Sequence, residues 1–261
     1  MSHLHGTGSA EWDVDEKVMR RFFGVKDEKN RIFIEVGAAR PDYLSISRLF
    51  RDNGWIVMSV EPNPEFCRLQ REAGNDVLEF ACGGRDEDNV DFTVVDSRAS
   101  DSGEVSYESF SSLGMKQDFK AIAPPNLQLR NIKVKMRRLS TLIELHAAGC
   151  QELSILSIDV EGWELEVLEG LDFSRHQPKC IILENLFNDV GYRKYLFERG
   201  YRLWRVLPPN DIYLHRCIPM SRLETAIFCL WDSIYCRFAM RWASIRSALG
   251  RSQNSAKIRV A

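Results

Sequence analysis

Short apolar segments alternate with amphipathic segments along most of the chain. The apolar segments are rich in β-branched residues and are bounded by Gly, Pro or Asn, a pattern typical of buried strands. The clearest are residues 32–36, 55–60, 76–81, 153–158 and 180–183. Between them, apolar residues recur at helical spacing, as at Tyr43, Ile46 and Leu49. Because parallel strands need crossover connections that are usually helical, this alternation predicts an α/β fold with a mostly parallel sheet.

Other segments alternate apolar and polar residues, as half-exposed strands do. Residues 90–94 and 132–136 show this pattern in the middle of the chain. Residues 201–206 and 211–214 flank the turn at Pro208-Pro209-Asn210. The last two segments are predicted to pair as a hairpin, which brings one antiparallel strand into the sheet.

A long stretch from residue 96 to 126 lacks a regular pattern. It is rich in Ser and contains Gly103, Gly114 and the pair Pro124-Pro125. Loops of this length in a compact domain are usually functional lids or mobile insertions. We expect a loop with at most one short helix, either a lid over the substrate or a plain insertion.

The two ends of the chain differ from the middle. Val14, Val18 and Phe22 fall on one face of a predicted short helix packed over the sheet. Beyond Cys217, apolar residues lie on one stripe of a predicted amphipathic helix flanked by Arg237 and Arg241. This helix either docks on its own sheet, forms a homodimer, or lies on an anionic membrane surface.

These patterns predict one domain over residues 30–216. A loop or lid insertion occupies residues 96–130, an N-terminal segment with a short helix precedes the domain over residues 1–29, and a basic helical tail follows over residues 217–261.

Composition narrows the functional classes. With 261 residues, 44% of them hydrophobic, the chain can bury one substantial core. Its net charge of −2 and pI near 6.3 provide no overall attraction to nucleic acid, so we expect no nucleic-acid partner.

Seven cysteines without paired C-x-x-C spacing indicate free thiols in a reducing compartment and no metal site. The N-terminus lacks a signal-peptide pattern, so we expect a cytoplasmic protein, either free or peripheral at the inner face of the membrane through its tail.

Polar residues directly follow several of the predicted strands. The carboxyl ends of parallel strands meet at one edge of a sheet, so these residues are expected at that edge. Gly37 and Ala38 would present backbone to a ligand in the crevice there, and Glu61 ends the next strand. A carboxylate in that place can accept both hydroxyl protons of an adenosine ribose. The turn reads G-A-A-R-P-D rather than G-x-G-x-x-G, and Pro41-Asp42 is predicted to open the following helix. Pyrophosphate binding is therefore disfavoured, whereas a nucleoside cofactor without phosphates, such as S-adenosylmethionine, is compatible.

Acidic residues also follow the strand at residues 153–158. Asp159 and Glu161 are candidates to orient or deprotonate an acceptor hydroxyl, or else one of them caps the next helix. Glu184, His146 and His215 are weaker candidates.

Four motifs together resemble the FkbM family of S-adenosylmethionine-dependent methyltransferases. In order, they read I-E-V-G-A-A, V-E-P-N-P-E-F, F-A-C-G-G and L-S-I-D-V-E-G-W-E-L-E-V-L-E-G. The likeness covers about residues 30–215, and the segment from Ile158 to Gly170 is the most specific part. It implies a Rossmann-like class I methyltransferase fold with a seven-stranded sheet, and O-methyl transfer to a hydroxyl of a sugar, glycolipid or small natural product.

The resemblance also implies a role for individual residues toward S-adenosylmethionine. The methionine part of the cofactor would lie against Glu35, Gly37 and Ala38. Its ribose would bind Glu61, and Pro62 and Asn63 would surround the adenosine. The adenine edge would meet Ala81 and Cys82.

Two other functions are compatible with such a sheet. A nicotinamide-dependent oxidoreductase is disfavoured because two glycines of the phosphate-binding turn are missing. A non-catalytic or membrane-associated scaffold would retain the fold without the reaction.

Overall fold

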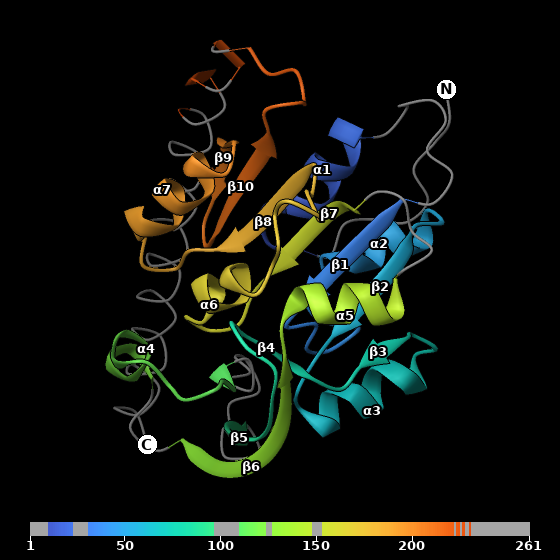
Figure 1. Ribbon diagram of the computed structural model, residues 1–261, viewed down its shortest axis with the longest axis vertical. Coiled ribbons are helices and arrows are strands. Elements are labelled where there is room, and N and C mark those ends of the chain that lie inside the picture. Colours follow the sequence, from blue (N-terminus) through green and yellow to red (C-terminus); the bar gives the residue numbers. More distant parts are fainter. Residues whose placement is uncertain are drawn as a thin grey trace, which may run out of the picture.

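A computed structural model describes residues 10–22, 31–96, 110–123, 127–147 and 153–221, together with a few residues between 223 and 230 (Figure 1). The helices are η1 (Glu11–Asp13), α1 (Val14–Phe22), α2 (Ser47–Asp52), α3 (Pro64–Glu72), α4 (Gln117–Ile122), α5 (Leu139–His146), α6 (Glu164–Glu169) and α7 (Val190–Glu198). The strands are β1 (Ile32–Val36), β2 (Ile56–Val60), β3 (Val77–Leu78), β4 (Ala81–Cys82), β5 (Glu87–Asp96), β6 (Gln128–Arg137), β7 (Leu153–Ile158), β8 (Cys180–Glu184), β9 (Tyr201–Leu207) and β10 (Asn210–His215).

Seven strands form one sheet in the order β3-β2-β1-β7-β8-β10-β9. The pairs β2/β3, β1/β2, β1/β7 and β7/β8 are parallel, whereas β10 is antiparallel to both β8 and β9. The predicted mostly parallel seven-stranded sheet with one antiparallel strand is therefore confirmed. Its central strands β1, β7 and β8 are buried along their whole length, because helices cover both faces.

Helices divide the core into one layer on each face of the sheet. Leu139 and Leu142 of α5 and Leu168 of α6 pack with Ile34 and Leu156 on one face. On the other face, residues of α1 and α2 pack with Phe33, Ile155 and Ile182, and they include Val18, Phe22 and Phe50. Figure 1 shows α5, α6 and α7 in front of the sheet. The predicted helix before β1 is thus confirmed as a packing element.

The predicted strand at residues 76–81 is confirmed for Val77 and Leu78 and wrong for its second half, because the chain changes sheets within it. Val77 and Leu78 pair with β2, and Phe80 N–H then donates to Leu78 O at 3.0 Å, which turns the chain away. Ala81 and Cys82 instead pair with β6 in a second sheet of order β4-β6-β5. The alternating segments at residues 90–94 and 132–136 form the antiparallel pair of this small sheet.

The predicted helix start at Pro41-Asp42 is also wrong. These residues form a turn, with positive φ at Ala39 (42°) and Leu44 (52°), and α2 begins at Ser47. The buried carboxylate of Glu35 explains that start, since it accepts hydrogen bonds from Ser47 N–H (3.2 Å) and Ser47 Oγ (2.6 Å). A buried carboxylate needs such donors, and the first turn of a helix offers them.

Several predictions fall on residues outside the described parts of the chain. They concern residues 1–9, residues 97–109 of the insertion, and the tail beyond residue 230, so the three roles considered for the tail helix stay predictions. Within the described ranges, no helix combines the length and apolar character needed to cross a membrane. Cys67, Cys82, Cys180 and Cys217 are free thiols.

The glycine after β1 provides a test of how tightly this fold packs. Gly37 has φ of +85°, and a Cβ added there would lie 1.7 Å from Asp159 O. Gly37→Ala should therefore lower the free energy of unfolding by more than about 2 kcal/mol, measured by urea denaturation. Gly74→Ala is the matched control, because Gly74 has φ of +79° but no atom within 4 Å of the added Cβ. It should lose only about 1 kcal/mol, and equal losses in both variants would contradict the close contact.

Candidate functional site

A cavity opens at the carboxyl ends of β1, β2 and β7, which are neighbours in the sheet. In open α/β sheets, ligands bind in the crevice outside these strand ends. The turn after β1 contributes Gly37 and Ala39, the turn after β2 contributes Glu61 and Pro62, and the loop after β7 contributes Asp159. The prediction that these separate motifs meet in one crevice is confirmed.

Glu61 is held in place by the backbone on two sides. Its carboxylate accepts from Ala39 N–H at 2.9 Å and from Asn63 N–H at 2.8 Å, one bond to each oxygen. The side chain is only 4% exposed, yet a carboxylate has about four lone-pair sites. Two remain for hydroxyl donors of a ligand.

Burial changes the acidity of Glu61. Desolvation raises its pKa from 4.5 to about 7, although the two backbone hydrogen bonds act in the opposite direction. The negative charges of Glu35 and Asp159 raise it further. This carboxyl is therefore only partly ionised near neutral pH.

Apolar side chains form the wall beside Glu61. They are Phe66 of α3, Phe80 and the short strand Ala81-Cys82, and Phe92 of β5. The small sheet thus closes one side of the cavity. This combination of a carboxylate with flat apolar walls suits a ribose joined to an aromatic base.

The loop after β7 is fixed by a buried acid. Glu164 is 2% exposed, and its Oε1 accepts from Val160 N–H at 3.1 Å and Gly162 N–H at 3.0 Å. Its other oxygen accepts from Tyr192 Oη at 2.8 Å. Glu161, with φ of +58°, is carried on this constrained loop and lines the cavity.

Asp159 faces the cavity and forms a hydrogen bond with Glu184 at the end of β8. Asp159 is an exposed residue at the cavity. Protein atoms nevertheless lie close around its carboxyl group, and this desolvation raises its pKa to about 7. Desolvation and the charge of Asp159 raise the pKa of Glu184 well above its ordinary value. Two carboxyls can share a hydrogen bond only when one is protonated, so Glu184 holds the proton and donates to Asp159.

Part of the insertion lies over the cavity. Ser111, Ser112 and Leu113 line it, and Ser112 exchanges two backbone hydrogen bonds with Thr93 of β5. Trp163 Nε1 donates to Gly114 O at 3.0 Å, which joins the insertion to the loop after β7. The described part of the insertion is therefore docked on the site and includes one short helix, α4. Whether it acts as a lid stays a prediction.

The other predicted residues lie close by, with different contacts. Ala38 is buried and does not line the cavity, and its carbonyl accepts from Gln70 Nε2 at 3.2 Å. The Asn63 side chain caps α3 by accepting from Glu65 N–H at 3.1 Å. Glu35 bonds to Ser47, as described above. The roles of these three residues toward a cofactor stay predictions.

The two histidine candidates lie elsewhere. His146 is exposed at the end of α5, and His215 packs edge-on against Tyr201 with ring centroids 5.1 Å apart. Neither lines the cavity. Within the described residues, no group of three or more His, Cys, Asp or Glu is placed to hold a metal ion.

Sequence reasoning missed the aromatic wall and the covering segment. Phe80 and Phe92 looked like ordinary core residues, because only the small sheet brings them to the cavity. The tryptophan in the G-W-E motif was a usable signal for Trp163, since a large side chain directly after a strand-end loop often lies at a site.

Comparison with known proteins agrees with this geometry. The methyltransferase FkbM domain matches residues 35–203, the greater part of the chain. The chain belongs to the FkbM methyltransferase family. Membership in this family implies a methyl donor.

A solved structure is also similar to the chain. It is the methyltransferase FkbM from Methylobacillus flagellatus KT, with 14% sequence identity and a TM-score of 0.44. The match covers 71% of this chain and 44% of the other, so the chain spans less than half the length of that protein. A search of curated proteins found no match.

Protonation of Glu61 should make stability depend on pH. Between pH 4.5 and about 7 the folded protein keeps this proton while the unfolded chain releases it, so the free energy of unfolding falls as pH rises through that window. Glu61→Gln should reduce this fall by up to about 1 kcal/mol per pH unit, measured by urea denaturation at pH 5, 6, 7 and 8. Glu65→Gln, exposed on α3, is the control and should leave the slope unchanged. An unaltered slope in Glu61→Gln would contradict the raised pKa.

Proposed function

We propose that the protein is an S-adenosylmethionine-dependent O-methyltransferase acting on a hydroxyl of a small-molecule or glycan acceptor. The observation that carries the proposal is the position of Glu61. Its buried carboxylate is fixed by Ala39 and Asn63 at the end of the second strand, beside flat apolar walls, in a chain of a methyltransferase family.

The cavity suits a nucleoside donor better than a dinucleotide. Glu61 would accept the ribose hydroxyls, Pro62, Phe66 and Phe80 would enclose the adenosine, and Ala81-Cys82 would meet the adenine edge. A pyrophosphate is usually seated on a helix N-terminus or paired with cations. Here α2 begins ten residues after Gly37 with its first N–H bonded to Glu35, and no Lys or Arg is among the described residues that line the cavity. These features also argue against a nicotinamide cofactor.

The chemistry then needs little from the protein beyond alignment and proton removal. S-adenosylmethionine supplies a methyl group on a positively charged sulfur, and the carbon–sulfur bond breaks with its electron pair remaining on sulfur as the new carbon–oxygen bond forms. The chain must hold the acceptor oxygen in line and take its proton. Asp159 is the ionised member of the Asp159–Glu184 pair and lies at the cavity, so it is our candidate for the proton acceptor. Glu161 would help to orient the acceptor.

Binding of the donor can be measured without knowing the acceptor. S-adenosylhomocysteine at about a hundred times its dissociation constant should stabilise the fold by about 2.7 kcal/mol, which is a rise in Tm of about 5–10 °C for a domain of this size. Glu61→Ala should abolish the rise, and Glu65→Ala should retain it. Absence of any shift in the unaltered protein at millimolar ligand would refute the proposed cofactor.

The reaction itself can be tested with S-adenosylmethionine labelled on its methyl group. Incubation with a panel of glycosides and hydroxylated natural products should transfer label to a product that resists alkaline hydrolysis, as an O-methyl ether does. Asp159→Asn should slow transfer about 10²–10⁴-fold, because a positioned base is lost, while its affinity for S-adenosylhomocysteine stays within about threefold. Unchanged transfer by Asp159→Asn would remove this residue from the mechanism.

A further inference from the structure

A second cavity lies beside the first, on the other side of the loop after β7. Its wall combines three regions: α4 with the residues before it, the loop and helix from Gly162 to Glu166, and the segment after β8 from Glu184 to Tyr192. With their open mouths included, it is the larger of the two, at about 930 Å³ compared with about 590 Å³. None of the motifs that identify the family assigns a role to it.

One carboxyl pair joins the two cavities. Asp159 lines the first cavity, Glu184 lines the second, and the two side chains share a hydrogen bond. Glu184 is 8% exposed, so its side of this contact is shielded from bulk solvent, whereas Asp159 is open to the first cavity. A molecule in the second cavity would therefore approach the donor pocket at the carboxyl group already assigned to proton removal.

The lining of the second cavity is built on fixed side chains. Asn185 Nδ2 donates to Asp211 Oδ2 at 2.9 Å and its Oδ1 accepts from Asp189 N–H at 2.7 Å, which holds the segment after β8. Phe119 of α4 packs edge-on against Phe187 with ring centroids 5.0 Å apart. The cavity thus combines polar groups that accept hydrogen bonds with aromatic surface.

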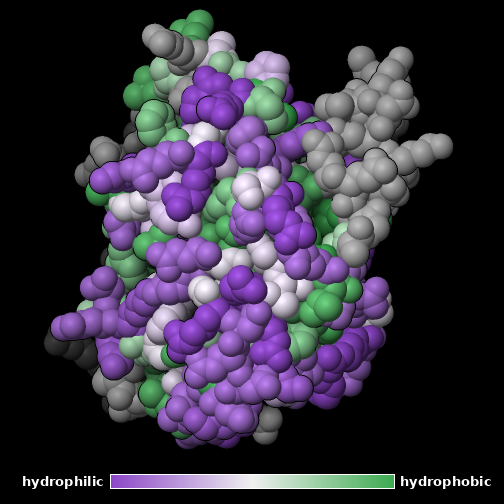
Figure 2. Space-filling model, viewed as in Figure 1, coloured by the Kyte–Doolittle hydropathy of each residue, from purple (hydrophilic) through white to green (hydrophobic). Residues whose placement is uncertain are grey.

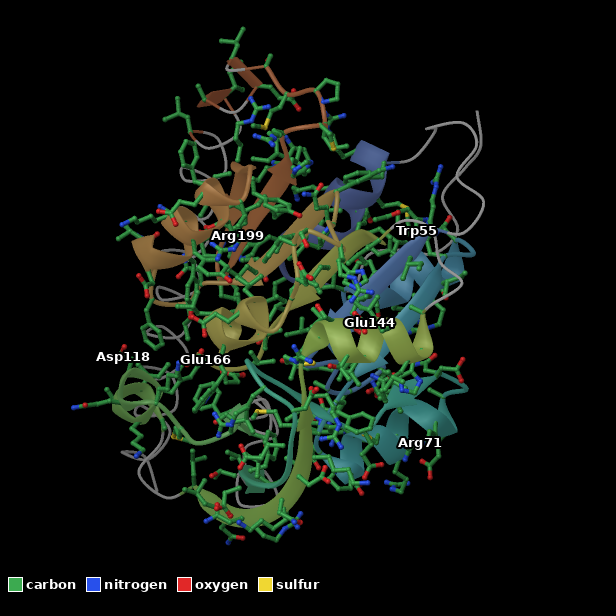
Figure 3. The ribbon with its side chains drawn as sticks, in the orientation of Figure 1. Trp55, Arg71, Asp118, Glu144, Glu166 and Arg199 are labelled. Atoms are coloured by element: carbon green, nitrogen blue, oxygen red, sulfur yellow. The ribbon has the colours of Figure 1, made fainter. Side chains whose placement is uncertain are left out.

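The lining holds more acidic than basic groups. Its carboxyls are Asp118, Glu164, Glu166, Asp189 and the protonated Glu184. Lys116 is the one cation among the described lining residues, and Glu166 Oε1 lies 2.9 Å from its Nζ. Figure 3 shows Asp118 on α4 and Glu166 on α6 on the same side of the molecule. An anionic ligand would meet repulsion here, whereas hydroxyl groups would find acceptors.

We propose that the second cavity binds the methyl acceptor, that this acceptor is an uncharged, hydroxyl-rich molecule, and that Glu184 positions Asp159 for proton removal. This inference rests on the proposed function. The acceptor hydroxyl would lie at the Asp159–Glu184 pair, and its proton would pass to the Asp159 carboxylate as its oxygen bonds to the methyl carbon. Aromatic surface from Phe119 and Phe187 suits the apolar faces of a ring bearing hydroxyls.

Occupancy of the second cavity can be measured directly by saturation-transfer NMR. The probes are methyl glycosides of the common hexoses and the matching hexose 6-phosphates, each added to the full chain with S-adenosylhomocysteine. We expect at least one neutral glycoside to bind, and its phosphorylated counterpart to bind about tenfold more weakly or not at all. Failure of every neutral glycoside, or equal binding of the phosphates, would overturn the assignment.

Substitutions in and outside the second cavity test whether the glycoside binds there. Leu165→Trp should fill the second cavity and abolish glycoside binding, while Leu145→Trp on the exposed face of α5 should not. Asp118→Lys should bring binding of the phosphorylated probe to within about threefold of the neutral one, and Glu169→Lys, exposed on α6 outside the cavity, should not. Retained glycoside binding in Leu165→Trp would place the acceptor elsewhere.

The role of Glu184 has a separate readout. Glu184→Leu removes the donor to Asp159, so the pKa of Asp159 measured by ¹³C NMR should rise, and Glu184→Gln should restore it by donating an amide N–H. An unmoved pKa in Glu184→Leu would show that Glu184 does not position Asp159. Affinity for S-adenosylhomocysteine, measured by calorimetry in every variant, tests the proposed function independently. If the unaltered protein does not bind S-adenosylhomocysteine, the proposed methyl donor is refuted. Glycoside binding by itself decides whether the second cavity is the acceptor site.

Discussion

The contact between the turn after β1 and the start of the loop after β7 determines the arrangement of the whole site. Asp159 N–H donates to Val36 O at 3.0 Å, and Gly37 N–H donates to Val60 O at 2.9 Å, so three neighbouring strands are joined at their carboxyl ends. The approach is so close that the position of a Cβ on Gly37 is taken by the carbonyl of Asp159. Gly37 thus acts through packing between strands. That packing brings Glu61 and Asp159 to one cavity.

Buried carboxyls accompany this contact and are stabilised in different ways. Glu35 and Glu61 accept hydrogen bonds from the starts of neighbouring segments, and Glu164 organises its own loop. Asp159 and Glu184 instead pair with each other, with the proton on Glu184, because desolvation raises the pKa of both carboxyls. Burial of these groups lowers stability unless they are protonated or hydrogen-bonded. Their concentration at one edge of the sheet indicates a functional site, where perturbed acidity is useful.

The small sheet and the insertion complete the site from outside the main sheet. β4 and β5 contribute Cys82 and Phe92 to the first cavity, and α4 contributes Phe119 to the second. Phe119 packs so close to Gly162 that an added Cβ there would lie 2.8 Å from its ring. The face of the molecule shown in Figure 2 is mostly hydrophilic. The insertion therefore contributes to the walls of both cavities.

The sequence by itself determined the α/β class, the positions of most strands along the chain, the hairpin at the end of the sheet and the family. These follow from local periodicity and from motifs whose spacing depends on neighbouring strands. It also placed Gly37, Glu61 and Asp159 at strand ends. The start of α2 at Ser47, the departure of Ala81 into a second sheet and the Asp159–Glu184 pair were decided only by tertiary structure. Each depends on which buried carboxyl or backbone group finds a partner from a distant segment, and no local pattern encodes that choice.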